Sequence, residues 1–577
     1  MTAEEIREQI KDVVMKNGGH LASSLGAVEL AMALAETFDP QTDRVVWDVG
    51  HQAYAWKILT GRAETFASLR TFGGISPFPN PQESRADAAV AGHAGSAFSV
   101  AAGFAAARDL RGSGEHVVAV IGDASIANGH SFEALNNLAA ATKKLIVVLN
   151  DNDMSISRPS GSFARFLGRL TSGVRYNRAK NATKAVGRAL RLGFLYRPVH
   201  VFKHFFKRMF LGDVYFEQFG LHYLGPVDGH DLVALTSALK AAKDEPRSVL
   251  VHVVTRKGKG FGPAEKDPTS YHGVSPAAVK RPEGRVSWSS AFGTALCELA
   301  RSDARIVALT AGMKDGTGLA GFAAEFPNRF YDVGIAEGHM VAFAGGMAGG
   351  GLRPVVAVYS TFLQRAVDQV MHDVAIANLP VVICVDRAGV VGADGVTHQG
   401  VFDLAMLRCL PNLTICQPQN AADLKALLQE ALKRNGPTVI RYPRGTCPAD
   451  DGAALPGATV ADHARVALWT TGDWYGKACE VARRVGGCEV VVARYLKPHD
   501  DARLQAQRSS GLAIVSLENG SVCGGLGEAL GADLKLGWPD VFIPHGSPAE
   551  LEKAYGLDVD ALVSRIGDFL KVRSPGD

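Results

Sequence analysis

Two polar residues follow neighbouring predicted strands in the first part of the chain, and together they could hold a metal ion. Asp123 ends the apolar run 117–122, and Asn152 follows the next run, 145–151. A helical pattern between them predicts a crossover, so both strands run parallel and end at one sheet edge. A carboxylate and an amide oxygen suit Mg²⁺, which also binds phosphate oxygens. The alternative is a pair of turn residues without a metal.

Histidines in Gly-rich turns form a second group of chemically capable residues. A single histidine in a loop is most often structural. Several at expected strand ends favour chemistry, because imidazole donates and accepts protons near neutral pH. The five are His20, His51, His93, His272 and His398.

Glu337 lies in the run VGIAEGH, at a predicted strand-to-helix turn among apolar residues. Burial raises the pKa of a carboxyl group and so allows it to share a proton. The alternative is a carboxylate that only stabilises a helix N-terminus. Tyr359 and Phe362, three residues apart, could present aromatic faces to a ligand, although such residues more often belong to a core.

Arginines end two strand-like stretches in the second half of the chain. Arg387 follows VVICVD and Arg444 follows TVIRYP, while Arg365 and Asp394 lie in nearby polar loops. The rigid guanidinium fork suits a phosphate group, so Arg387 and Arg444 are candidates for a phosphate clamp. Alternatively, both pair with carboxylates between domains and only hold the fold together.

Composition excludes several classes of protein. The 577 residues are 47% hydrophobic and 21% charged with a net charge of +3, which does not indicate nucleic acid as a partner. Eight scattered cysteines without a CxxC pair favour free thiols in a reducing cytoplasm. The N-terminus lacks a signal-peptide pattern, and no apolar stretch is long enough to span a bilayer. We therefore expect a cytoplasmic protein with no stable membrane association.

One basic segment differs from the rest. Residues 162–210 contain twelve Lys or Arg and no Asp or Glu, with interleaved aromatic residues. The simplest interpretation is a solvated helical excursion over the active site. A helix at a membrane surface and a nucleic-acid contact are the alternatives.

Alternation of short β-branched runs with helical stretches predicts an α/β fold of three domains with mostly parallel sheets. Breaks rich in Gly, Pro and polar residues place the domains at 1–280, 281–450 and 451–577.

Longer segments carry a family resemblance. Gly122 and Asp123, followed by Asn152, resemble the thiamine-diphosphate signature. Segments such as WDVGHQAYAWKILTGR, LNDNDMSIS, GPVDGHD, DRAGVVGADGVTHQG and RYPRG occur in the order found in the 1-deoxy-D-xylulose-5-phosphate synthases. These segments cover nearly the whole chain, so it resembles that family within the transketolase-like thiamine-diphosphate enzymes.

The resemblance implies a transferase reaction. Pyruvate and D-glyceraldehyde 3-phosphate would condense with loss of CO₂, using thiamine diphosphate and Mg²⁺, in a homodimer with a transketolase-like fold. The product would feed isoprenoid, thiamine and pyridoxal biosynthesis. A transketolase transferring ketol groups between sugar phosphates, and a silent homologue acting as a binding subunit, are the alternatives.

The resemblance also assigns roles to residues. The first domain would bind the diphosphate with Mg²⁺, and the second would bind the pyrimidine. The third would be a transketolase C-terminal-like domain. Glu337, His20, His398 and His51 would be catalytic. Mg²⁺ would be bound by Asp123, Asn152 and the Met154 carbonyl. The cofactor would contact His51, Gly92, His93, Ala94, Ala124, Ser125, Asn152, Phe261, Glu337, Tyr359 and Phe362. The substrates would contact Arg387, Arg444, Tyr359, Asp394 and His272. Ala94, Ala124 and Gly338 depart from the family pattern.

Overall fold

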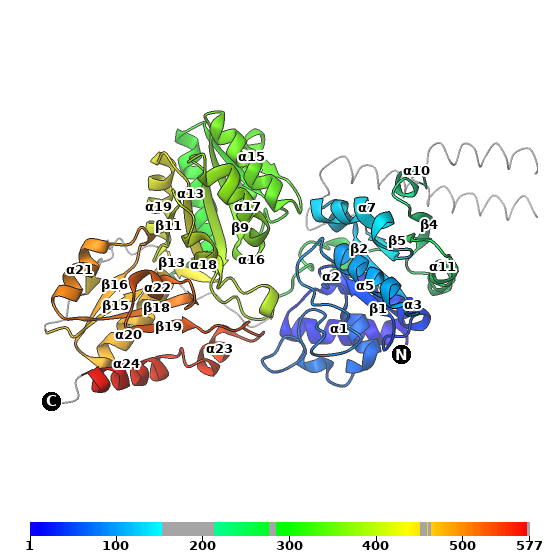
Figure 1. Cartoon of the computed structure of the whole chain (residues 1–577), viewed down its shortest axis with the longest axis horizontal. Coiled ribbons are helices and arrows are strands. Elements are labelled where there is room, and N and C mark those ends of the chain that lie inside the picture. The colour runs from blue at the N-terminus through cyan, green and yellow to red at the C-terminus, as the bar shows by residue number, and fades with distance from the viewer. Residues whose placement is uncertain (153–212, 276–283, 450–457, 460–462, 574–577) are drawn as a thin grey trace, which may run out of the picture. The chain divides into compact units, whose positions relative to one another are not determined.

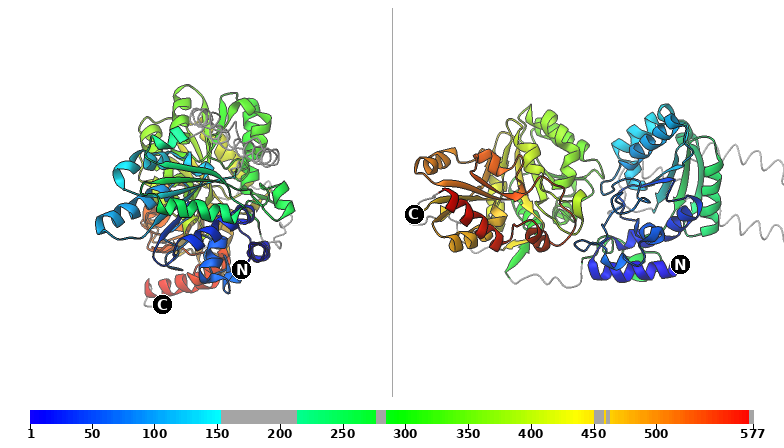
Figure 2. Two further views of the ribbon diagram at one scale, coloured as in Figure 1. Left: turned by 90° about the vertical axis from the view of Figure 1, so that its right-hand side faces the viewer. Right: turned by 60° about the horizontal axis from the view of Figure 1, so that its bottom comes forward.

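The computed structural model describes residues 1–152, 213–275, 284–449, 458–459 and 463–573. Met154 and the basic segment 162–210 lie outside these described residues. The chain divides into two compact units, which are described separately (Figures 1 and 2). The first unit contains residues 1–70 and 74–277, and the second contains residues 71–73 and 278–577.

The first unit is built on a five-stranded parallel sheet with the strand order β1-β2-β3-β5-β4. Its strands are short and rich in β-branched residues that are buried on both faces, as expected of a parallel sheet between helices. The strands are β1 (Arg44–Trp47), β2 (Val117–Gly122), β3 (Ile146–Asp151), β4 (His222–Asp228) and β5 (Val249–Val254).

Helices cover both faces of this sheet (Figure 1). Residues of α1, α3 and α11 pack with alternate residues of β2, β3 and β5, and α5 and α7 pack with the others. The helices are α1 (Ala3–Asn17), α2 (Leu21–Gly26), α3 (Val28–Thr37), α4 (Tyr54–Lys57), α5 (Ala97–Arg111), α6 (Asp123–Ile126), α7 (Gly129–Ala141), α10 (Asp213–Glu217), α11 (Leu232–Asp244) and α12 (Gly262–Lys266).

The second unit contains two larger sheets. The first has seven strands in the order β17-β11-β12-β10-β9-β7-β8, parallel except for β17. These strands are β7 (Ile306–Thr310), β8 (Phe330–Asp332), β9 (Arg353–Tyr359), β10 (Val382–Ala388), β11 (Thr414–Cys416), β12 (Thr438–Pro443) and β17 (Tyr495–Lys497). Its helices include α13 (Trp288–Ser302), α14 (Ala320–Glu325), α15 (Glu337–Gly349), α16 (Ser360–Leu363), α17 (Val367–Gln369), α18 (Asp403–Arg408) and α19 (Ala421–Lys433).

The other large sheet has the order β14-β16-β15-β18-β19, with only β14 antiparallel. Its strands are β14 (Ala458–Thr459), β15 (Val466–Thr470), β16 (Cys488–Val492), β18 (Ala513–Ser521) and β19 (Leu534–Trp538). Its helices are α20 (Tyr475–Val485), α21 (Asp501–Ser509), α22 (Leu526–Leu530), α23 (Pro548–Ala554) and α24 (Val559–Arg573).

The predicted α/β class with mostly parallel sheets is confirmed. Two elements were not expected in the segments predicted to be breaks. β6 (Arg285–Ser287) and β13 (Thr446–Pro448) form a small antiparallel pair. The predicted boundary near residue 450 lies within the second unit and stays a prediction. Among the described residues, no helix has both the length and the apolar character needed to cross a membrane.

Candidate active site

Asp123 and Asn152 lie at the same edge of the first sheet. Asp123 begins α6 directly after β2, and Asn152 follows β3. The two strands are parallel, and Gly122 stands opposite Asn150 in the register. Burial, reinforced by the nearby Asp151 carboxylate, raises the pKa of Asp123 to about 7. Two carboxyl groups therefore lie close together at this edge, and a bound cation would stabilise their charged forms.

Lys257 is a charged residue at this edge that the sequence reasoning missed. It follows β5 in the sequence TRKGKG, and its side chain is buried. Burial lowers the pKa of Lys257 to about 8, while the nearby Asp123 acts in the opposite direction. A lysine in a Gly-rich loop at a strand end was the available signal. Lys257 therefore places a positive charge near the carboxyl groups of Asp123 and Asp151.

Buried hydrogen bonds fix the strand ends beneath Asp123 and Asn152. Asn150 donates to Gln52 Oε1 over 2.6 Å and accepts from the Thr255 hydroxyl over 2.6 Å. Asp151 contacts His252 Nε2 at 3.0 Å, and His252 contacts the Tyr223 hydroxyl at 2.7 Å. These bonds join the carboxyl end of β3 to β5 and to its neighbours. They thereby fix the end of the strand that Asn152 follows.

The turn before α5 is held by Asp48. Its carboxylate accepts hydrogen bonds from the Gly95 N–H at 2.9 Å and the Ala97 N–H at 3.1 Å. A Cβ atom at Gly95 would lie 2.6 Å from Asn128 Oδ1, so only glycine fits this close approach. This anchoring sets the position of the predicted cofactor contacts that precede it, Gly92, His93 and Ala94.

The remaining predicted contacts of the first unit occupy short helices. Ala124 and Ser125 lie in α6, and Ser125 is buried. Phe261 precedes α12 as its N-cap residue, and its ring lies edge-on to Tyr271.

Three of the five predicted histidines form one cluster. The ring centroids of His20 and His51 lie 5.9 Å apart, and His272 lies 5.6 Å from each. Burial lowers the pKa of His51 and His272 well below 6.5, and the neighbouring histidines and Lys257 act in the same direction. Both imidazoles are therefore neutral at pH 7. His51 Nδ1 is buried without a hydrogen-bond partner among the described residues.

Glu337 begins α15 in the second unit and is 4% exposed. Burial raises the pKa of its carboxyl group, against the weaker effect of Arg365. Its Oε2 atom is buried and has no hydrogen-bond partner among the described residues. A buried, unpaired carboxyl oxygen is unfavourable, which points to a ligand atom as its partner.

Gly338 follows Glu337 directly. A Cβ atom there would lie 3.0 Å from Gln369 Oε1, and this oxygen too is buried without a partner among the described residues. The Gln369 side chain thus lies against the position where most amino acids would place a Cβ atom. Sequence reasoning did not identify Gln369.

Tyr359, Phe362, His398 and Arg387 form a second cluster at the carboxyl ends of β9 and β10. The rings of Tyr359 and Phe362 are stacked with centroids 5.9 Å apart, and Phe362 lies 5.6 Å from His398. Arg387 donates to the Tyr359 hydroxyl at 2.8 Å, and its guanidinium carbon lies 3.7 Å from the ring centroid. The structure therefore brings these four predicted residues together.

The second arginine, Arg444, lies just beyond β12. Its Nη1 donates to the Val391 carbonyl at 3.1 Å and lies 3.7 Å from an Asp394 oxygen. Beneath Arg387, the buried Asp386 carboxyl accepts a 2.7 Å hydrogen bond from Ser289. Burial raises the pKa of Asp386 to about 6, although Arg387 opposes this. Neither Asp386 nor Ser289 was predicted to be functional.

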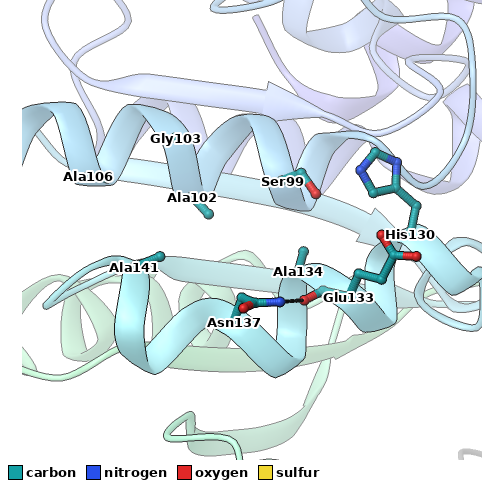
Figure 3. A pocket seen from close by; sticks show the side chains of 9 residues that line it. All are labelled: Ser99, Ala102, Gly103, Ala106, His130, Glu133, Ala134, Asn137 and Ala141. Atoms are coloured by element: carbon teal, nitrogen blue, oxygen red, sulfur yellow. Dashed lines mark hydrogen bonds between the residues drawn. The ribbon is translucent and has the colours of Figure 1, made fainter.

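Two further features of the described residues bear on metal and ligand binding. No group of three or more His, Cys, Asp or Glu side chains is arranged to hold a metal ion. An open groove of about 350 Å³ lies between α5 and α7, lined mainly by small residues (Figure 3). None of the predicted site residues lines this groove.

Comparisons with known proteins identify the family. The family model described as 1-deoxy-D-xylulose-5-phosphate synthase matches residues 1–255. The 1-deoxy-D-xylulose-5-phosphate synthase 1 of Geobacter metallireducens is 45% identical to this chain. The match covers 99% of this chain and 96% of the relative. The chain belongs to the 1-deoxy-D-xylulose-5-phosphate synthase family. A synthase of the same name from Desulforudis audaxviator is 45% identical over 97% of this chain and 93% of its own length.

A second family model matches the middle of the chain, and a solved structure is also similar to it. The transketolase pyrimidine-binding domain model matches residues 284–449. Among solved structures, a transketolase from Leishmania mexicana is 19% identical, covering 100% of this chain and 98% of its own, with a TM-score of 0.47. Thiamine diphosphate and Mg²⁺ are the cofactors of the synthase family.

The residues of this chain fit those cofactors. The buried Glu337 Oε2 has no partner among the described residues, so a bound ring nitrogen would satisfy it. A Cβ atom at Gly122 would meet only Ser125 Oγ, at 4.0 Å, so the turn that leads to Asp123 is open. The acidic edge at Asp123 and Asp151 would be neutralised by a divalent cation.

Proposed function

We propose that this chain joins pyruvate to D-glyceraldehyde 3-phosphate with release of CO₂, forming 1-deoxy-D-xylulose 5-phosphate. The observation that carries this proposal is 45% identity to a 1-deoxy-D-xylulose-5-phosphate synthase over 99% of the chain. Bound thiamine diphosphate would supply the nucleophilic carbon for the reaction and accept the electrons left by decarboxylation. The product would enter isoprenoid, thiamine and pyridoxal biosynthesis.

In the first unit, Asp123 and Asn152 would bind Mg²⁺, and Lys257 would contribute positive charge towards the diphosphate. The raised pKa of Asp123 supports this role, because a cation stabilises the carboxylate that burial disfavours. Met154 would add its carbonyl. The turn at Gly92, His93 and Ala94, together with Ala124, Ser125 and Phe261, would complete the cofactor contacts.

The histidine cluster would act on the substrates. His51 and His272 are neutral at pH 7 because burial lowers their pKa, so each ring offers one donor and one acceptor. Neutral rings can donate to a developing negative charge on oxygen and exchange protons with it. His20, which lies against both, would share this work. The family resemblance assigns a catalytic role to His398 as well.

In the second unit, Glu337 would hold a proton at the pyrimidine ring of the cofactor. Its raised pKa supports this role, and so does its Oε2 atom, which lacks a hydrogen-bond partner within the described residues. Tyr359 and Phe362 would present their ring faces to the same ligand. Arg387 and Arg444, with Asp394 beside Arg444, would bind the phosphate of the acceptor aldehyde through charge-assisted hydrogen bonds.

The assembly and location of the chain are further parts of the proposal. We infer a homodimer from the family relationship. A cytoplasmic location rests on the sequence pattern alone.

An assay of product formation tests the function. Purified protein with Mg²⁺ and thiamine diphosphate should release one CO₂ per 1-deoxy-D-xylulose 5-phosphate formed from pyruvate and glyceraldehyde 3-phosphate. Ketol transfer between sugar phosphates without CO₂ would instead identify a transketolase. An Asp123→Ala variant is the matched control, and it should bind neither cofactor nor substrate productively because a hard oxygen ligand is lost.

A further inference from the structure

Lys257 lies in a loop, residues 255–261, at the sheet edge where Asp123 and Asn152 lie. Hydrogen bonds hold this loop from several sides. The Thr255 N–H donates to the Asp151 carbonyl at 2.9 Å, and the Gly258 N–H donates to the Ala22 carbonyl at 2.8 Å. Between these two anchors the Arg256 N–H donates to the side chain of His230, Nε2, at 2.9 Å. This bond is made directly before Lys257, so it bears on where the lysine stem begins.

The hydrogen bonds of His230 define its tautomer. Nε2 accepts the Arg256 N–H, so it carries no proton. Nδ1 therefore carries the proton and donates to Glu29 Oε2 at 3.2 Å. The ring bridges α3 and the loop after β5, and neither interaction survives if the ring is removed.

Glu29 is itself fixed by a buried pair. Arg7 of α1 contacts both Glu29 oxygens at 2.6 Å. The bonds from His230 and Arg7 hold the pKa of Glu29 at about 2, despite burial, so it stays a carboxylate. The Arg7 side chain also lies against Gly260, where a Cβ atom would come 2.8 Å from Arg7 Cδ. The chain Arg7–Glu29–His230 thus meets the loop on both sides of Lys257.

We propose that His230 is a positioning residue that places Lys257 for the cofactor diphosphate. This inference rests on the proposed function. In this role His230 would act through its protein contacts and not by touching the cofactor. It supports the backbone at Arg256, and the Arg7–Glu29 pair fixes the orientation of its ring. For comparison, replacing residues that support metal ligands typically lowers metal affinity by about 10- to 100-fold.

Two polar substitutions of similar size separate this role from general stability. In His230→Gln the side-chain carbonyl reaches about as far as Nε2 and can accept the Arg256 N–H. In His230→Asn the shorter side chain cannot. We expect Asn to raise the dissociation constant of Mg²⁺–thiamine diphosphate about 10-fold, measured by calorimetry, and Gln to change it less than about 3-fold. The control is His116→Leu, directly before the amino end of β2, and it should leave the dissociation constant of Mg²⁺–thiamine diphosphate unchanged.

Hydrogen exchange at Arg256 tests the contact without any cofactor. The Arg256 amide should exchange at least about 10-fold faster in His230→Asn than in wild type, and near the wild-type rate in His230→Gln. Equal exchange rates in all three proteins would overturn the proposal. A wild type that binds no thiamine diphosphate would refute the proposed function, while the exchange result would still decide whether the contact exists.

A double-mutant cycle tests whether His230 acts through Lys257. Lys257→Met alone should weaken cofactor binding, and adding His230→Asn should then have little further effect. Fully additive losses would show that His230 acts by another route and would overturn its assignment. We also expect the maximal turnover rate of His230→Asn at saturating cofactor to stay within about 3-fold of wild type, because His230 would affect cofactor binding and not the chemical step.

Discussion

Glu337 is buried, and its Oε2 atom has no hydrogen-bond partner in the part of the chain that the structure describes. Its proton is therefore central to the proposed chemistry. In Glu337→Gln the side chain keeps its size but cannot share a proton. We expect cofactor binding within about 3-fold of wild type but slower exchange of the thiazolium C2 proton, followed by NMR. An unchanged exchange rate would remove Glu337 from the mechanism.

Asp386 predicts a pH-dependent effect on stability. Its pKa is raised from 3.8 to about 6 by burial, so the folded protein holds this proton more tightly than the unfolded chain. The contribution of Asp386 to the free energy of unfolding therefore falls as pH rises from about 4 to about 6, by up to about 3 kcal/mol. Outside this window it is constant.

Asp386→Asn removes this titration and can still accept the Ser289 hydrogen bond. The melting temperature of the variant should exceed that of wild type at pH 7.5, and the gap should shrink at pH 4.5. Comparing the two proteins at each pH cancels the other titrating groups. A gap of the same size at both pH values would contradict the assignment.

Arg387 and Arg444 allow the phosphate clamp to be tested by substrate choice. Replacing either by Met should lower kcat/KM for glyceraldehyde 3-phosphate by about 10- to 100-fold, because each charge-assisted contact contributes about 1.5–3 kcal/mol. Unphosphorylated glyceraldehyde should lose much less, and pyruvate binding should hardly change. Equal losses with both aldehydes would instead fit arginines that only support the fold.

The individual residues also show what sequence can reveal. The positions of Asp123 and Asn152 were predictable, because turn residues after apolar runs lie at the carboxyl ends of parallel strands, whereas their roles stay predictions. The position of Lys257 was not predictable, because lysine side chains are usually solvated and its burial depends on segments distant in sequence. Asp386 was hidden for the same reason.

At the scale of elements, the turn between β7 and α14 lies against the Tyr359 hydroxyl. A Cβ atom at Gly316 would overlap this hydroxyl, and Tyr359 in turn accepts the hydrogen bond from Arg387. We expect Gly316→Ala to displace Tyr359 and lower kcat/KM at least about 10-fold. Gly321→Ala is the matched control, because its Cβ would meet only Cys297 Sγ, at 4.0 Å. Equal activity of the two variants would show that the turn is not constrained.

Periodicity predicted most of the central elements. β2, β3, β7, β9, β10 and β18 are the expected β-branched runs, and α7 is the expected helix between β2 and β3. The pair of β6 and β13 was missed, since each has three residues and they pair across 161 positions of sequence. Pairing of such short, distant strands leaves no periodic signal in the sequence.

At the scale of the whole molecule, we expect a homodimer. Sedimentation velocity should give a single species of twice the 61.1 kDa chain mass. The result should hold with and without Mg²⁺–thiamine diphosphate if the interface is permanent. An active species at the monomer mass would contradict this prediction.

The sequence predicts three domains, which stays a prediction, and the described residues contain three sheets of five or more strands. Two of these sheets belong to a single compact unit, and their side chains share a continuous core that includes Val385 and Trp469. Sequence breaks can mark where a chain changes from one sheet to the next. They cannot reveal whether adjacent sheets bury a common apolar surface, because that depends on tertiary packing.

The first sheet bears its candidate chemistry at one edge, and this leaves the other edge free for engineering. Asp123 and Lys257 follow the carboxyl ends of their strands, while the amino end of β2 lies about 17 Å away along the strand. The preceding loop, residues 112–114, is exposed. A fluorescent protein inserted there, or a tether to a sensor surface, should therefore leave catalysis intact, giving a site for immobilising the enzyme or reporting on it.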